Sequence, residues 1–171
     1  MTYANLPAGR KVDLRSPPQP SPVEAGRAKL ELLKLNIEEA LALIGACRSA
    51  TLLDALRMLS GSALNPLRAY VAGEELVIAV GSYSLLGVNV REGRVKTWED
   101  WRERLAAAAR DAADVAAKRL MTVVLDKGEE APTELKDAVR KLAAAVEKGE
   151  LKELERMLVR LKEELQGIAS A

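Results

Sequence analysis

Apolar residues recur every three or four positions along residues 30–44, which predicts an amphipathic helix. The stripe consists of Leu30, Leu33, Ile37, Leu41 and Ile44. Before it, Ser21-Pro22-Val23-Glu24 supplies an N-cap serine, a proline at the first helical position and a glutamate at the third, which together form a capping box. We therefore expect a helix from about residue 22 to Cys47, and a second, short helix from about Thr51 to Gly61.

The middle of the chain consists of short apolar runs broken by turn residues, a pattern typical of β-strands. Residues 75–80, 83–90 and 94–96 form three such runs, and Tyr70 and Val71 offer a fourth. The sequence predicts a three- or four-stranded antiparallel meander, inserted at about residues 69–97. Its strands carry apolar residues at both alternating positions, so either helices cover both faces of the sheet or one face is left for a partner.

Helical periodicity returns after the predicted sheet. Thr97 is expected to cap a long helix that extends to about Asp126. Its apolar stripe consists of Trp101, Leu105, Ala108, Ala112, Val115, Leu120 and Val123. Pro132 begins another helix, and leucines spaced three and four apart mark a last one after Gly149. Because so few residues separate these two helices, we expect an antiparallel helical hairpin at about residues 132–166.

These patterns predict a mainly α fold with a small antiparallel β insertion, an α+β class with about five helices around a three- or four-stranded meander. Residues 21–171 are expected to form a single helix-rich domain. Residues 1–20 are expected to form a flexible arm, because Pro17, Pro18 and Pro20 favour extended geometry and the segment has little to bury.

Composition and charge limit the partners, the source and the cellular location that we expect for this protein. The 26 lysines and arginines almost balance the 25 acidic residues, so the whole chain has no general attraction for nucleic acid or anionic lipid. Few amide and many charged side chains match the tendency of thermophilic proteins, and we expect a thermophilic, archaeal origin. With no recognisable signal peptide and no long apolar run, we expect a cytoplasmic location and no membrane partner.

The residues needed for several common chemistries are absent or poorly placed. The chain contains no histidine, which excludes Ser-His-Asp and Cys-His catalysis and histidine-ligated metals. The stretch 81–84 lacks the second glycine of a nucleophile elbow. Asp111 and Asp114 could share a hard cation, although Arg110 and Lys118 favour surface ion pairs instead. The lone Cys47 fits a small buried side chain. We expect no catalytic residue, cofactor or metal.

Two basic clusters are the remaining candidates for contact with a partner. Arg91, Arg94 and Lys96 lie on the last predicted hairpin, and Arg10, Lys11 and Arg15 lie in the predicted arm. Together with Tyr70, Tyr83 and Trp98 they could form a modest nucleic-acid surface with stacking groups. The simpler interpretation is that these charges are solvated and have no partner.

These observations favour a non-enzymatic structural or interaction subunit of a larger assembly, with a protein partner or self-association. Two versions fit: a helical coat protein of an archaeal virus, and the small helical subunit of an archaeal CRISPR interference complex. The first alternative is a nucleic-acid-binding module that uses the β-hairpin and the basic arm. The second is a small enzyme with a carboxylate or lysine centre.

Overall fold

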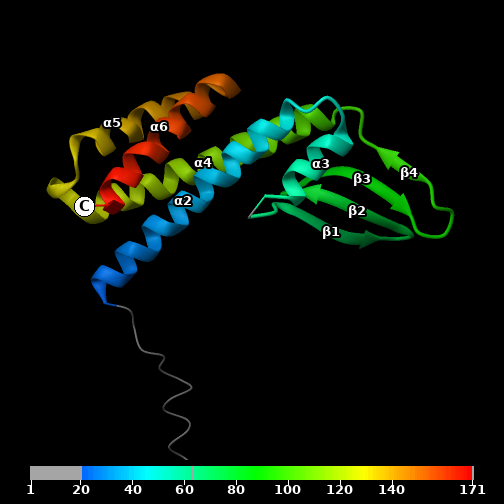
Figure 1. Ribbon diagram of the computed structural model, residues 1–171, viewed down its shortest axis with the longest axis horizontal. Helices are drawn as coiled ribbons and strands as arrows, with labels where there is room; N and C mark the ends of the chain where they lie inside the picture. The colour runs from blue at the N-terminus through cyan, green and yellow to red at the C-terminus, as the bar shows by residue number, and fades with distance from the viewer. Residues whose placement is uncertain (1–20, 63, 171) are drawn as a thin grey trace, which may run out of the picture.

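A computed structural model describes residues 21–62 and 64–170 of the chain. It confirms the mainly α fold with a small antiparallel sheet (Figure 1). In chain order the elements are α2 (Pro22–Cys47), α3 (Leu52–Ser60), β1 (Leu67–Ala72), β2 (Glu75–Val80), β3 (Tyr83–Asn89), β4 (Val95–Thr97), α4 (Trp101–Lys127), the 3₁₀ turn η2 (Gly128–Glu130), α5 (Thr133–Lys148) and α6 (Leu151–Ser170).

The long helices α2 and α4 lie antiparallel along most of the molecule (Figure 1). Near one end of the pair, the Arg102 Nε donates a hydrogen bond of 3.0 Å to the Cys47 carbonyl. Near the other end, Lys29 forms an ion pair with Asp126. Fully buried alanines on both helices allow their backbones to approach closely; they are Ala40 and Ala46 on α2 and Ala109, Ala113 and Ala116 on α4.

The expected start of α4 is wrong. Thr97 belongs to β4, where it pairs with Leu86, and α4 begins only at Trp101. The predicted stripe is also displaced at its centre, since Val115 is 41% exposed and Ala112 is half-buried, whereas the alanines named above are buried. Alanine carries little periodic signal, so the spacing of larger side chains could not reveal which alanines face α2.

The sheet is a four-stranded meander in the order β1-β2-β3-β4, with every neighbouring pair antiparallel. It begins at Leu67, slightly before the predicted start of the insertion. A register shift after Ile78 lies opposite Leu85, which is completely buried. Leu85 and Val80 belong to the same core as the helices, while Gly73 and the turn 90–94 lie at the far end of the strands.

The C-terminal helices form the expected antiparallel hairpin, through Gly149, whose φ of 71° is left-handed. The Arg110 Nε of α4 donates a hydrogen bond of 2.8 Å to the Gly149 carbonyl and so fastens the turn to α4. Helix α6 is also linked to α2, by the ion pairs Arg48–Glu155 (2.7 Å) and Lys162–Glu38 (3.1 Å). The hairpin therefore lies along the α2–α4 pair, away from the sheet (Figure 1).

Candidate interaction surfaces

A row of four apolar side chains crosses the whole sheet on one face. Val71 pairs with Leu76, Leu76 with Val88, and Val88 with Val95, and residues directly opposite each other in antiparallel strands share a face. We call these four residues the apolar row. Val71 is 72% exposed, Leu76 36% and Val95 62%, while Val88 is half-buried. The part of the sheet distant from the helices thus leaves apolar side chains in water on this face.

The opposite face is covered by side chains of the sheet and its connection to α4. A Cβ added to Gly87 would lie 3.8 Å from the Trp98 ring, and Val77 and Ala79 are almost completely buried. The Tyr70 hydroxyl shares a hydrogen bond of 3.0 Å with the Ser84 hydroxyl, across the intervening strand β2. This self-coverage explains how the sheet can be apolar on both faces without helices on both.

The structure separates the three predicted basic residues of the hairpin. Arg91 forms a 3.3 Å ion pair with Glu74, and Arg94 a 3.3 Å ion pair with Glu92, at the tip of the sheet. Lys96 shares the covered face with Gly87, where its ammonium lies 4.9 Å from the centre of the Trp98 ring. The tip therefore carries charges of both signs and no continuous basic patch.

Two of the three predicted aromatic residues lie on the same covered face as Lys96, since Trp98 lies beside Lys96 and Tyr70 shares its cross-strand row, but the third does not join them. Tyr83 lies at the opposite end of β3, and its hydroxyl bonds to Asp111 of α4. Arg10, Lys11 and Arg15, with the whole predicted arm of residues 1–20, lie outside the described residues.

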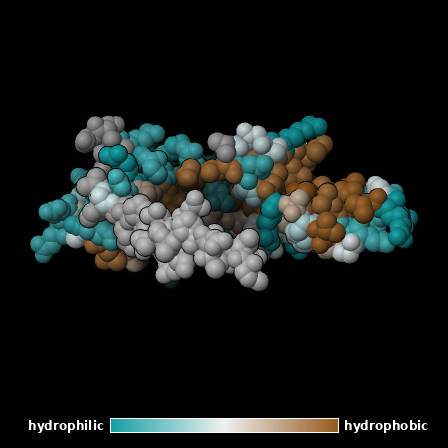
Figure 2. Space-filling view, turned by 90° about the horizontal axis from the view of Figure 1, so that it is seen from below, coloured by the Kyte–Doolittle hydropathy of each residue, from teal (hydrophilic) through white to brown (hydrophobic). Residues whose placement is uncertain are grey.

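Figure 2 shows hydrophobic residues gathered over the sheet end of the molecule, next to hydrophilic residues at its tip. Other exposed apolar side chains are spread over α2, α3, α4 and α6, among them Leu53 and Leu125. Single exposed apolar residues are normal on protein surfaces, whereas a contiguous group often marks an interaction site. The apolar row is such a group, because its members are neighbours in the strand register.

Cys47 has the surroundings of a core residue. Its side chain is buried near the end of α2, and its Sγ lies 3.9 Å from the Arg102 carbonyl oxygen. Burial raises the pKa of this thiol, and the opposing effect of Arg110, Arg102 and Arg48 is smaller. The neutral thiol is therefore favoured, which is the reverse of what a nucleophilic cysteine requires.

The acidic residues singled out in the sequence have structural partners. Asp111 accepts the hydrogen bond from Tyr83, and Asp114 forms a 2.8 Å ion pair with Lys118. Among the described residues, no group of three or more cysteine or carboxylate side chains is placed to hold a metal ion. The same part of the chain contains no fully buried charged residue.

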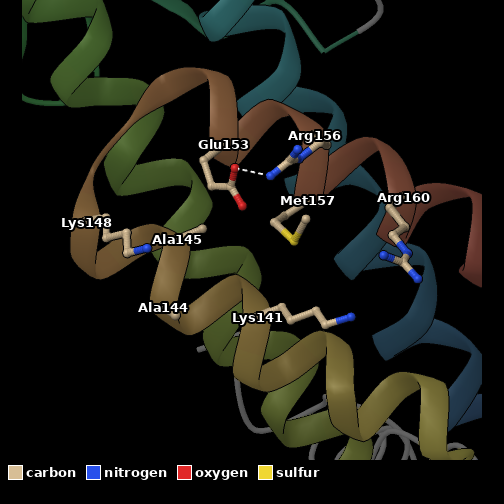
Figure 3. Close-up of a pocket in the computed structure, with 8 residues that line it drawn as sticks. All are labelled: Lys141, Ala144, Ala145, Lys148, Glu153, Arg156, Met157 and Arg160. Atoms are coloured by element: carbon tan, nitrogen blue, oxygen red, sulfur yellow. Dashed lines mark hydrogen bonds and ion pairs between the residues drawn. The ribbon is translucent and has the colours of Figure 1, made fainter.

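Two surface hollows of similar size lie away from the sheet. One, of about 430 Å³, opens between α5 and α6, and its basic side chains come from positions that the sequence analysis did not single out (Figure 3). The other, of about 470 Å³, lies where α2, α4 and α6 meet beside Cys47, and acidic and basic residues line it in equal numbers. No sequence signal identifies the first hollow, because it depends on which faces of two helices are left outside.

Comparisons with known protein families, with curated proteins and with solved structures find no match for this chain. None of the helices in the described part of the chain is long and apolar enough to cross a membrane.

Proposed function

We propose that this protein is a non-catalytic subunit of a larger assembly and that copies of the chain associate through the apolar row of their sheets. The observation that supports this most directly is the continuity of the row across all four strands, with three of its members at least 36% exposed. Sheets pack face to face through such apolar surfaces in β-sandwiches.

The charges beside the row favour a second copy as the partner. The tip carries two positive residues, Arg91 and Arg94, and two negative ones, Glu74 and Glu92. A tip of one sign would repel its own copy, whereas a balanced tip allows opposite charges to meet across a two-fold axis. The four-stranded face is small for a permanent interface, so we expect association that depends on protein concentration or is reinforced by further contacts.

The larger assembly is proposed from composition and architecture. Abundant Lys, Arg and Glu with few amide side chains support a thermophilic, archaeal source. A coat-like protein of an archaeal virus and the small helical subunit of an archaeal CRISPR interference complex both remain consistent with rigid helices that carry an interaction sheet. A cytoplasmic location is part of the same proposal.

Measurement of the mass in solution across a range of protein concentrations tests the association. The full chain should form dimers or larger species, and the double variant Val71→Lys/Val95→Lys should remain monomeric. Both positions are well exposed, so the variant should stay folded and keep its helical circular-dichroism signal. Val115→Lys is a matched control on α4, because Val115 is also exposed but lies outside the sheet. A parent chain that stays monomeric at every concentration would contradict self-association.

A charge-reversal variant separates this proposal from nucleic-acid binding. Changing Arg91 and Arg94 to glutamate makes the tip uniformly acidic beside Glu74 and Glu92, and changing Lys96 to glutamate as well removes the cation beside Trp98 on the covered face. This triple variant should lose association through like-charge repulsion and keep its helical circular-dichroism signal. The parent and the variant are also mixed with labelled DNA and RNA at several salt concentrations. Salt-sensitive binding by a monomeric parent, lost in the variant, would favour the nucleic-acid module instead.

A further inference from the structure

A second surface lies on the C-terminal hairpin, in the groove between the outer sides of α5 and α6. The hollow of about 430 Å³ is lined from α5 by Lys141, Ala144, Ala145 and Lys148, and from α6 by Glu153, Arg156, Met157 and Arg160. In Figure 3, Met157 projects from α6 into the space between the two helices. A smaller hollow continues past Lys141 and Arg160 toward Glu134.

The larger hollow is strongly basic. It brings four cationic side chains together with a single acid, Glu153, and that acid is already paired with Arg156. Lys141 and Lys148 form no ion pair with any other described residue. Arg160 reaches Glu164 only at 3.6 Å. The positive charge of the groove is thus largely uncompensated.

The bottom of the groove is formed by small or apolar side chains, which leave it open. Ala144 and Ala145 leave space where larger side chains would fill the gap between the helices, and the Met157 thioether lies opposite them. Methionine adapts to side chains of different shape and is common on surfaces that bind helices. A bulky apolar side chain of a partner could occupy this space while acids beside it reach the surrounding cations.

The continuation of the groove carries more acids than cations. Glu134, Asp137 and Glu164 line the smaller hollow together with Lys141 and Arg160, which also line the larger one. From Glu134 to Lys148 the groove follows fifteen residues of α5, or about 20 Å, and most of its acids lie toward the Glu134 end. A nucleic-acid backbone lying along it would meet repulsion at the acidic end. A peptide can place its carboxylates at the basic end alone.

We propose that this groove binds an amphipathic helix of a protein partner, with apolar side chains on the alanine floor and acidic residues next to Lys141 and Lys148. The site is separate from the sheet (Figure 1), so it does not depend on association through the apolar row. The binding mode is that of a helix in a groove, with charge fixing its direction.

The test uses the full chain with isotope-labelled methionine methyl groups and a synthetic helical peptide. The peptide is an amphipathic repeat of leucine and alanine, with glutamate in one half and lysine in the other. Its addition should shift the Met157 methyl resonance saturably. Met58 and Met121, which are about half exposed on α3 and α4, should not respond and serve as internal controls.

Matched variants test the groove itself. Lys141→Glu should weaken binding about tenfold, because a cation next to the peptide acids becomes a repelling anion. Lys136→Glu makes the same change on α5 outside the groove and should alter binding less than about twofold. Ala144→Leu should also block binding, because Ala144 is exposed and a leucine would fill the floor without disturbing the core.

Three results would overturn the proposal. They are the absence of a saturable shift at Met157, equal weakening of binding by Lys136→Glu and Lys141→Glu, and undiminished binding by Lys141→Glu and Ala144→Leu variants that remain folded. A short DNA duplex that shifts Met157 as strongly as the peptide would also overturn it, in favour of a nucleic-acid surface. Because the measurement follows Met157 in any oligomeric state, failure here leaves the proposal for the sheet intact.

Discussion

The Tyr83 hydroxyl donates a hydrogen bond of 3.0 Å to an Asp111 carboxylate oxygen and so joins the first residue of β3 to α4. This bond raises the pKa of Tyr83 above its ordinary value of 10.0, because the carboxylate favours the protonated phenol. The orientation of the sheet relative to the helices depends in part on this link. A second link lies nearby, where Arg104 of α4 donates to the Ser84 carbonyl.

We expect Tyr83→Phe to reduce the free energy of unfolding by about 0.5–1 kcal/mol at neutral pH, the usual contribution of one hydrogen bond. Since the folded-state pKa is raised, the stabilisation is complete below the unfolded-state pKa and is lost as the pH rises through the folded-state value. Urea unfolding of both proteins between pH 7 and 11 should therefore show their stabilities converging at alkaline pH. A constant difference would contradict this role of the bond.

The cap of α2 is a second target. The Glu24 amide donates to the Ser21 hydroxyl at 3.2 Å, and the Ser21 amide donates to the Glu24 carboxylate at 3.3 Å. Ser21→Ala should cost about 1 kcal/mol, the typical loss on removing an N-cap oxygen. Chemical denaturation measures it, and Ser21→Asp is the control because aspartate can also cap. Equal losses in both variants would show that the cap oxygen is not the cause.

Leu33 tests the docking of the same helix. Its side chain is completely buried, whereas Leu35, on α2 two residues later, is 44% exposed. Leu33→Ala should destabilise the protein by roughly 2–5 kcal/mol, since it removes buried methyl groups and leaves a cavity. Leu35→Ala makes the same chemical change and should cost about 1 kcal/mol or less. Denaturation curves with indistinguishable midpoints for the two variants would mean that α2 does not pack as described.

Cys47 should react slowly with thiol reagents in the native protein. It is buried and burial raises its pKa, so both access and thiolate formation are unfavourable. The rate of labelling by a chromogenic disulfide should rise sharply in denaturant and should follow the unfolding transition. Rapid labelling of the folded chain at neutral pH would indicate an accessible, activated thiol and would contradict the role of Cys47 as an unreactive core residue.

The sequence was sufficient to predict the helices and the meander because their signals are local. Ser21 and Glu24 form the capping box, Thr51 caps α3 as expected, and Gly149 turns the hairpin with a left-handed backbone. The predicted start of α4 was wrong because the contact that decides it is not local. Thr97 satisfies the local pattern of a helix cap, but pairing with Leu86 extends the sheet through it, and this long-range contact leaves no local signal.

The candidate surfaces were less accessible to prediction. That the strands are apolar on both faces could be read from the sequence, and it left two alternatives: helices over both faces, or one face reserved for a partner. The register was needed to place Val71, Leu76, Val88 and Val95 in one row, and to put Lys96 on the other face from them. The α5–α6 groove also depends on how two helices pack, so Lys141 and Met157 looked like ordinary helix residues.

The even number of strands in the meander has a consequence for how this chain can change. An antiparallel chain returns to the end at which it entered after every second strand, so β1 begins and β4 ends on the side of the helices. Gly73 and Gly93 lie in the turns at the opposite end, where a Cβ would meet no atom within 4 Å. Residues can be inserted in pairs at these turns, preserving the alternation of the side chains, without altering the path between α3 and α4. The reach and shape of the sheet can therefore diversify while the helical framework stays unchanged.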